Sequence, residues 1–219
     1  MESLDTLYVM GLDDELAQAT RWVETSLELD IDADFQVFEA VIRMVGGLLA
    51  GHLATRSSIM LDRARELADR LLPAFTRSPT GMPYRFVNLH TGAVRTPANF
   101  VAEIGTNLVE FGALSKLVGD DRYLRVAKAA AKGVFHRRSA LDLIGTTIDG
   151  ETGAWLDHVS AGPQPPVDSY YEYLQDGSRF LDDPELALWF QTLSSMTELR
   201  VARCPASNPP TILITASKT

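Results

Sequence analysis

The sequence predicts an all-α protein, an α/α toroid with short β-hairpins in its loops. Two observations predict this fold. Helical segments alternate between helices that are apolar on one side and helices that are apolar nearly all round. Between them lie two short segments with the residues of strands and tight turns. A helix that is apolar on most faces is covered on most sides, so the alternation indicates a covered inner ring and an exposed outer ring.

Six helices are expected, three in each ring. The outer helices cover roughly 13–28, 58–75 and 120–135, and the inner helices roughly 36–54, 100–118 and 166–181. The inner helices should bury Val41, Ile42 and Leu108, and the outer helices should expose Arg63 and Arg125. The first outer helix is expected to have, on its apolar side, Leu16, Trp22, Val23 and Leu27.

Two hairpins are expected between an outer helix and the next inner helix. One covers Tyr84–Val94 and contains Thr91-Gly92, and the other covers Leu143–His158 and contains Thr152-Gly153. Both would cap the same end of the ring. The tail at 201–219 has no helical period and is rich in Pro, Ser and Thr, so it is expected to be irregular or disordered.

Composition excludes some kinds of partner. The chain of 219 residues has a formal net charge of −9, which argues against nucleic acid and against an anionic membrane surface. Cys204 is the only cysteine, so no internal disulfide is expected. No signal peptide opens the chain, and the most apolar segment, Val41–Leu53, is shorter than a membrane span.

Each inner helix carries an acidic residue near its start. Glu103 follows Glu39 by 64 residues, and Asp168 follows Glu103 by 65 residues. Near-equal spacing indicates one structural repeat, a helix pair with a hairpin, used twice, which would turn three acids toward a shared cavity. Structural roles stay open for each acid alone. Glu39 and Arg43 fit an ordinary i,i+4 ion pair, and Glu103 and Asp168 fit helix-start residues that bind backbone N–H groups.

A cluster of buried carboxylates needs a functional reason, because burying each one is costly unless it is paired. Glycoside hydrolysis supplies such a reason: one carboxylic acid protonates the leaving oxygen and a second carboxylate activates water. An apolar ring would raise the pKa of the acids, which suits the proton donor. Asn107 and Glu110 continue the polar stripe that begins at Glu103, while Tyr170 and Tyr171 could form an aromatic wall for a sugar.

Several stretches, in order along the chain, resemble the motifs of glycoside hydrolase family 47, the class I α-1,2-mannosidases. The resemblance runs from about Leu4 to about Leu188, and its motifs are long. They lie at 4–12 (LDTLYVMGL), 38–43 (FEAVIR) with 46–50 (GGLLA), 71–75 (LLPAF), 83–84 (PY), 87–89 (VNL), 102–106 (AEIGT) with 110–111 (EF), and 168–174 (DSYYEYL).

The resemblance implies an (α/α)7 barrel that hydrolyses α-1,2-linked mannose of N-glycans with inversion. It implies a calcium ion at the barrel base and a place in the secretory pathway, in the endoplasmic reticulum or Golgi, or secretion. By motif, Glu39 matches a catalytic carboxylate, usually taken as the acid, and Asp168 matches a second one. Arg43 and Glu103 match residues that line the glycan site. The assignment of acid and base stays open.

The departures from the family pattern predict a partial domain. The later family motifs, with another catalytic glutamate and the threonine that holds calcium, have no counterpart after Leu188, and Pro166 stands where an arginine is common. We therefore expect 1–200 to be a partial family 47 domain, inactive as given and without a metal ligand of its own, and 201–219 to be an unrelated tail. The alternatives are a mannose-recognising relative like the ER-degradation-enhancing mannosidase-like proteins, and a non-functional product.

Overall fold

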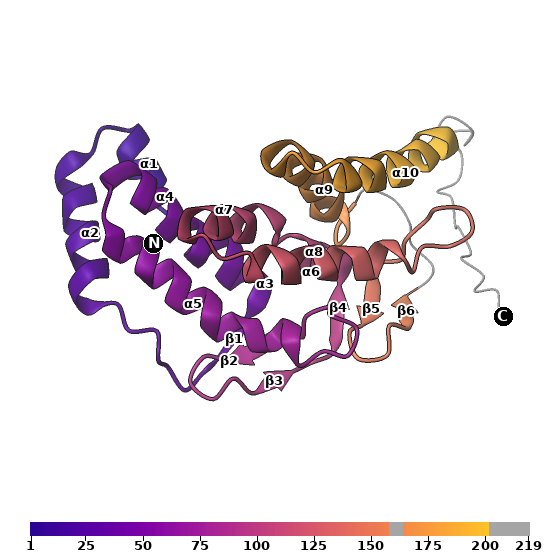
Figure 1. Ribbon diagram of the computed structural model, residues 1–219, viewed down its shortest axis with the longest axis horizontal. Coiled ribbons are helices and arrows are strands. Elements are labelled where there is room, and N and C mark those ends of the chain that lie inside the picture. The colour runs from indigo at the N-terminus through magenta and orange to yellow at the C-terminus, as the bar shows by residue number, and fades with distance from the viewer. Residues whose placement is uncertain (158–163, 202–219) are drawn as a thin grey trace.

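The computed structural model describes residues 1–157 and 164–201, with the backbone alone at 196–201. It is mainly helical, with two small antiparallel sheets along one edge (Figure 1). The prediction for 201–219 falls almost wholly outside the described residues. The helices are α1 (Leu4–Val9), α2 (Asp13–Ser26), α3 (Val37–Glu39), the π-helical turn η1 (Ala40–Val45), α4 (Gly46–Thr55), α5 (Ser58–Thr76), α6 (Val101–Gly105), α7 (Leu108–Val118), α8 (Arg122–Phe135), α9 (Asp168–Leu181) and α10 (Pro184–Val201).

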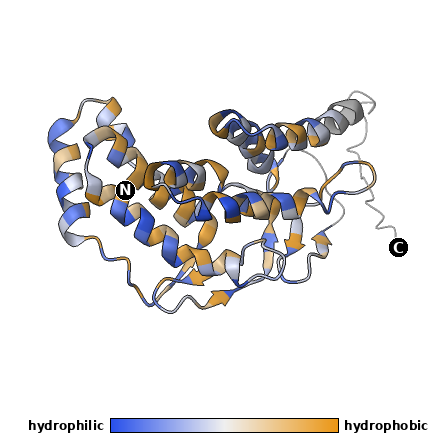
Figure 2. Ribbon diagram, in the orientation of Figure 1, coloured by the Kyte–Doolittle hydropathy of each residue, from blue (hydrophilic) through white to orange (hydrophobic). Residues whose placement is uncertain are grey.

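The helices form the two predicted layers. The covered layer contains α3, η1, α4, α6, α7 and α9, and each of its helical stretches packs on the outer helix that follows it in the chain, α5, α8 or α10. Val41 and Leu108 are completely buried, whereas Arg125 is exposed and Arg63 is partly exposed. In Figure 2, hydrophilic and hydrophobic residues alternate along α5, as in a helix with one covered face. Closure of the layers into a toroid stays a prediction.

Two details of the layer prediction are wrong. Trp22 does not join the apolar side of α2, since its side chain is 53% exposed while Val23 is buried. Helix α9 is covered on one side only, because Tyr170, Tyr171 and Leu174 are buried but Phe180 is 46% exposed. In both helices, the sequence pattern predicted a covered apolar side chain, Trp22 or Phe180, that no neighbouring helix of the described residues covers.

The covered helical stretches are interrupted, which the sequence did not predict. Between α6 and α7 the chain leaves the helical conformation at Asn107, whose φ is −139°. The completely buried Asn107 amide donates to the carbonyl oxygens of Glu103 (3.3 Å) and Ile104 (2.9 Å), so it satisfies the end of α6. In η1, the Gly46 N–H donates to the carbonyl of Val41, five residues back, which defines a wide π-helical turn.

The loops contain three-stranded sheets in place of simple hairpins. Strands β2 (Phe86–Asn88) and β3 (Val94–Arg95) form the first predicted hairpin, and β5 (Thr147–Asp149) and β6 (Trp155–Asp157) form the second. The segments just before α3 and α6 each add a strand, β1 (Asp34–Gln36) and β4 (Ala98–Phe100). These strands have three residues each, too few for an alternating pattern to predict them. They lead directly into α3 and α6, so they help to orient these helices.

The predicted repeat is visible in the turns of the two sheets. The Oδ1 of Asn88 accepts hydrogen bonds from the N–H groups two and three residues on (3.0 and 2.9 Å), and the Oδ1 of Asp149 does the same (2.9 and 2.8 Å). Gly92 and Gly153 follow with φ of +66° and +72°, a conformation that favours glycine. Bonds from Thr152 and Glu151 lower the pKa of Asp149 against a smaller opposing effect of burial.

One helical stretch among the described residues, Val37–Thr55, is long and apolar enough to cross a membrane by length and composition. Val41, Val45 and Leu48 within it are completely buried by the neighbouring helices of the protein. Of its apolar window, 44% is buried in the described structure.

Candidate active site

The three predicted acids lie in the first turns of covered helices. Glu39 is the third residue of α3, Glu103 is the third residue of α6, and Asp168 opens α9. Helix α3 packs against α6, and α6 packs against α9. The N–H of Ala102 also donates to the carbonyl of Pro166 (2.9 Å), which ties α6 to the segment before α9. The structure thus brings the starts of these helices together, and convergence of the acids on one cavity stays a prediction.

Glu39 and Arg43 form the predicted i,i+4 ion pair. The Arg43 guanidinium also pairs with Glu2, a partner that the sequence did not indicate. Hydrogen bonds from Arg43 to Glu39, and then to Glu2, raise the pKa of Arg43. The side chains of Arg43 and Glu39 are 50% and 40% exposed, so both can reach a bound molecule.

Glu103 is buried in a polar cluster. Its two carboxylate oxygens accept a forked pair of hydrogen bonds from Arg85, at 2.9 Å from Nε and 2.9 Å from Nη2. The Gln36 side chain donates a third bond to Oε1, also at 2.9 Å. The hydrogen bonds that this carboxylate accepts come from side chains of β1 and of the segment before β2, and none comes from a backbone N–H of the described residues.

Asp168 is partly buried at the start of α9, where the helix dipole favours a negative charge. The next residue, Ser169, accepts a hydrogen bond from Thr106 (2.7 Å), at the break between α6 and α7. The break between α6 and α7 therefore helps to fix the start of α9. Both the catalytic and the helix-start interpretation of Asp168 remain open.

Glu110 does not extend the stripe of Glu103 into the same cluster. It lies between α7, α9 and the start of α4, where its Oε1 accepts a hydrogen bond from the Tyr173 hydroxyl (2.8 Å) and its side chain faces Gly46. Its Oε2 is buried and has no hydrogen-bond partner among the described residues. Burial raises the pKa of Glu110, against the smaller opposing effect of the Tyr173 bond.

We expect Glu110→Gln to stabilise the protein by about 1–2 kcal/mol at pH 8 and to change little at pH 4. The pKa of Glu110 is higher in the folded state than in the unfolded state, so the unfolded state ionises first as the pH rises. Stability therefore falls with rising pH between these two pKa values, and glutamine removes this loss. Urea unfolding at both pH values measures it. Glu172→Gln, at an exposed carboxyl of α9, is the control, and an equal pH effect in both variants would refute the argument.

The described residues do not supply a metal site. Among residues 1–157 and 164–201, no three His, Cys, Asp or Glu side chains come together as the ligands of an ion would. The calcium ion that the family resemblance implies is held by a threonine of a later motif, and that motif has no counterpart after Leu188. No chemical step is assigned to calcium here.

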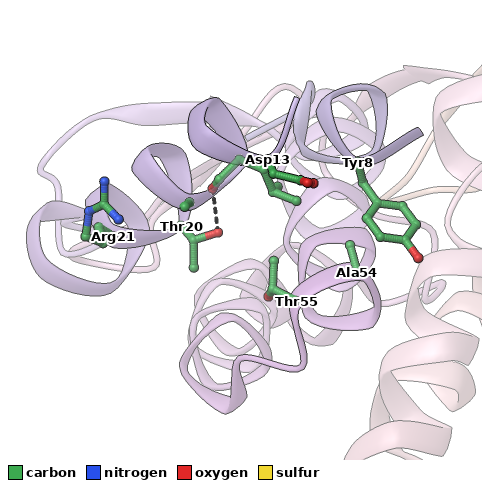
Figure 3. Close-up of a pocket in the computed structure, with 8 residues that line it drawn as sticks. Tyr8, Asp13, Thr20, Arg21, Ala54 and Thr55 are labelled. Carbon is green, nitrogen blue, oxygen red and sulfur yellow. Dashed lines mark hydrogen bonds between the residues drawn. The ribbon is translucent and has the colours of Figure 1, made fainter. Parts of the chain in front are cut away.

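An open pocket of about 410 Å³ lies between α1, α2 and the end of α4 (Figure 3). Its two threonine hydroxyls are already used, because Thr20 donates to the carbonyl of Leu16 (2.7 Å) and Thr55 to that of Gly51 (2.7 Å). It also lies at the opposite end of the 37–55 stretch from Glu39, roughly 20 Å away by helical rise. We assign it no part in the site.

Two layers of helices with acids in the first turns of the covered layer are the arrangement expected of a helical glycoside hydrolase. The model of glycosyl hydrolase family 47 matches residues 1–218, and the chain belongs to this family. This confirms the resemblance drawn from the motifs.

The relatives come from both branches that the sequence left open. The human ER degradation-enhancing alpha-mannosidase-like protein 2 is 40% identical over 204 residues, covering 87% of this chain and 35% of the relative. The mannosyl-oligosaccharide 1,2-alpha-mannosidase MNS1 of Arabidopsis thaliana is 32% identical over 225 residues, covering 94% of this chain and 39% of the relative. The chain spans about a third of the length of the curated relatives that it matches.

A solved structure supports the fold. The alpha-1,2-mannosidase from Trichoderma reesei superposes with a TM-score of 0.74 at 27% sequence identity, covering 92% of this chain and 44% of that chain. The fold of this chain is thus shared with a glycosidase that is named as an alpha-1,2-mannosidase.

Proposed function

We propose that this chain carries part of the site of an inverting α-1,2-mannosidase that acts on the mannose residues of N-glycans. The observation that supports this proposal is the position of Glu39, Glu103 and Asp168 in the first turns of three neighbouring covered helices. Inverting hydrolysis needs a proton donor on one face of the sugar and a water-activating carboxylate on the other. Glu39 and Asp168 take these two roles, in an order that remains to be assigned.

In this proposal Arg43 and Glu103 belong to the sugar-binding part of the site, Arg43 by direct contact and Glu103 through the side chain that it holds in place. The Arg43 guanidinium is half exposed and already holds the Glu39 carboxylate, so it can orient this group and donate to a hydroxyl. The proposed place of action is the endoplasmic reticulum or Golgi, on mannose-rich glycoproteins; a relative named for ER degradation and one named as a mannosyl-oligosaccharide mannosidase support it.

A second function deserves the same test, because a relative at 40% identity is named for enhancing ER degradation. Under this alternative, the protein recognises mannose on glycoproteins with little or no hydrolysis. Binding of an oligomannose without release of mannose would favour it.

We expect the purified 219-residue chain to release no mannose from an α-1,2-linked oligomannose. The resemblance implies a further catalytic glutamate that has no counterpart after Leu188, and loss of one positioned general acid or base costs about 10²–10⁴-fold in rate. Low stability is also expected, because side chains such as Phe180 and Leu188 are about half exposed.

The assay measures free mannose with added calcium and, separately, with a chelator. Calcium-dependent turnover that disappears in Glu39→Gln would show that the chain holds a complete site. Turnover that survives in Glu39→Gln would remove Glu39 from the catalytic pair.

A further inference from the structure

Arg85 occupies a joint between the two covered helices that carry Glu39 and Glu103. Its backbone carbonyl accepts a hydrogen bond from the N–H of Val37 (3.0 Å), the first residue of α3. Its side chain forms the forked ion pair with Glu103 in the first turn of α6. One residue is therefore bonded to the starts of both helices, through different parts of its structure.

The orientation of the Arg85 side chain is fixed on several sides. The guanidinium lies over the ring of Phe100, 4.8 Å from its centre, and 5.8 Å from the centre of the Phe86 ring. Nε and Nη2 are held by Glu103, and Gln36 fixes the Glu103 carboxylate in turn. A planar guanidinium held by a carboxylate and an aromatic face loses little freedom on binding a further group.

Within the ion pair of this cluster, Arg85 is the more exposed partner. The Glu103 side chain is 10% exposed and its oxygens already accept three hydrogen bonds, whereas the Arg85 side chain is 30% exposed. Its third nitrogen, Nη1, donates no hydrogen bond to any residue in 1–157 or 164–201. Glu103 thus has little surface to offer a ligand, and Arg85 has an oriented N–H donor.

We infer that Arg85 is a further glycan-binding residue, held in place by Glu103 and Gln36 so that Nη1 donates to a sugar hydroxyl. Glu103 is then the positioning residue of the pair. This inference rests on the proposed function, since it requires that the site bind mannose-containing oligosaccharides. The competing explanation is that Arg85 only neutralises Glu103 within the fold.

Arg85→Lys separates these explanations. Lysine keeps the positive charge beside Glu103 but loses the fork and Nη1. The matched control is Arg95→Lys in the same sheet, whose side chain is 67% exposed and pairs with Asp34 (3.0 Å). Binding of an α-1,2-linked oligomannose to the full 219-residue chain is measured by saturation-transfer NMR, together with the thermal midpoint of each variant.

We expect Arg85→Lys to weaken oligomannose binding by about tenfold or more, the loss of a hydrogen bond to a charged donor. Arg95→Lys should leave binding unchanged. Equal affinities in the two variants would overturn the inference while leaving the proposed function intact. No binding by the unaltered chain would overturn both.

A second measurement covers the case in which Arg85→Lys fails to fold. In the unaltered chain labelled with ¹⁵N, titration with the same oligomannose should shift the Nε–Hε resonance of Arg85 and leave that of Arg95 in place. A binding chain whose Arg85 resonance does not move would refute the contact.

Discussion

Gly105→Ala should destabilise the fold by about 3 kcal/mol, because the new methyl group has no room. A Cβ at position 105 would lie 2.2 Å from Cδ2 of the Tyr170 ring. This ring cannot move aside easily, since it is completely buried and its hydroxyl donates to the carbonyl of Ala131 (2.8 Å). The contact joins α6 to α9, so the damage falls on the packing between these two helices.

Urea unfolding measures this loss, and the thermal midpoint should fall by roughly 6–12 °C for a chain of this size. Gly177→Ala is the control on α9. There a Cβ would meet the end of the flexible Leu186 side chain at 3.3 Å, so a change within about 1 kcal/mol is expected. Similar losses in both variants would show that α6 and α9 are not packed as described.

Asn107→Asp should cost about 3–5 kcal/mol at pH 7, the cost of an uncompensated buried charge. The Asn107 amide donates to two carbonyl oxygens at the end of α6 and is completely buried. An aspartate would turn a negative oxygen toward those same carbonyls. Below the raised pKa expected for this new carboxyl, the protonated form can donate one of the two bonds again.

The destabilisation by Asn107→Asp should therefore shrink as the pH falls from 7 to 5, relative to the unaltered chain measured in parallel. Chemical unfolding across this pH range tests it. If Asn107→Asp lowers the stability by the same amount at every pH, the side chain at 107 reaches water and the Asn107 amide is not buried as described.

The layering of the helices could be predicted because it depends on long runs of apolar residues with a helical period. Val41 and Leu108 each belong to such a run, and both are completely buried. Single residues are harder to place. Trp22 fits the apolar side of α2 by spacing, yet it is exposed because nothing described packs over it. The breaks at η1 and Asn107 depend on tertiary contacts that periodicity does not contain.

The site divides in the same way. The pairing of Glu39 with Arg43 follows from local i,i+4 spacing, so the sequence could predict it. Arg85 and Gln36 lie 18 and 67 residues from Glu103, and the sheet pairing that brings them to it rests on strands of three residues or fewer. The available signal was Arg85 itself, a charged residue next to the Pro83-Tyr84 motif.

The π-helical turn at Ala40–Val45 sets the azimuth of Glu39 around the axis of its helix. A turn of this kind holds one residue more than an α-helical turn, and each residue of an α-helix adds about 100° of rotation. Without the extra residue, Glu39 would point about 100° away from its present direction relative to Val45 and Leu48, which the core holds fixed. Deleting one residue from this turn would therefore preserve a helix and its burial while steering the acid away from its neighbours.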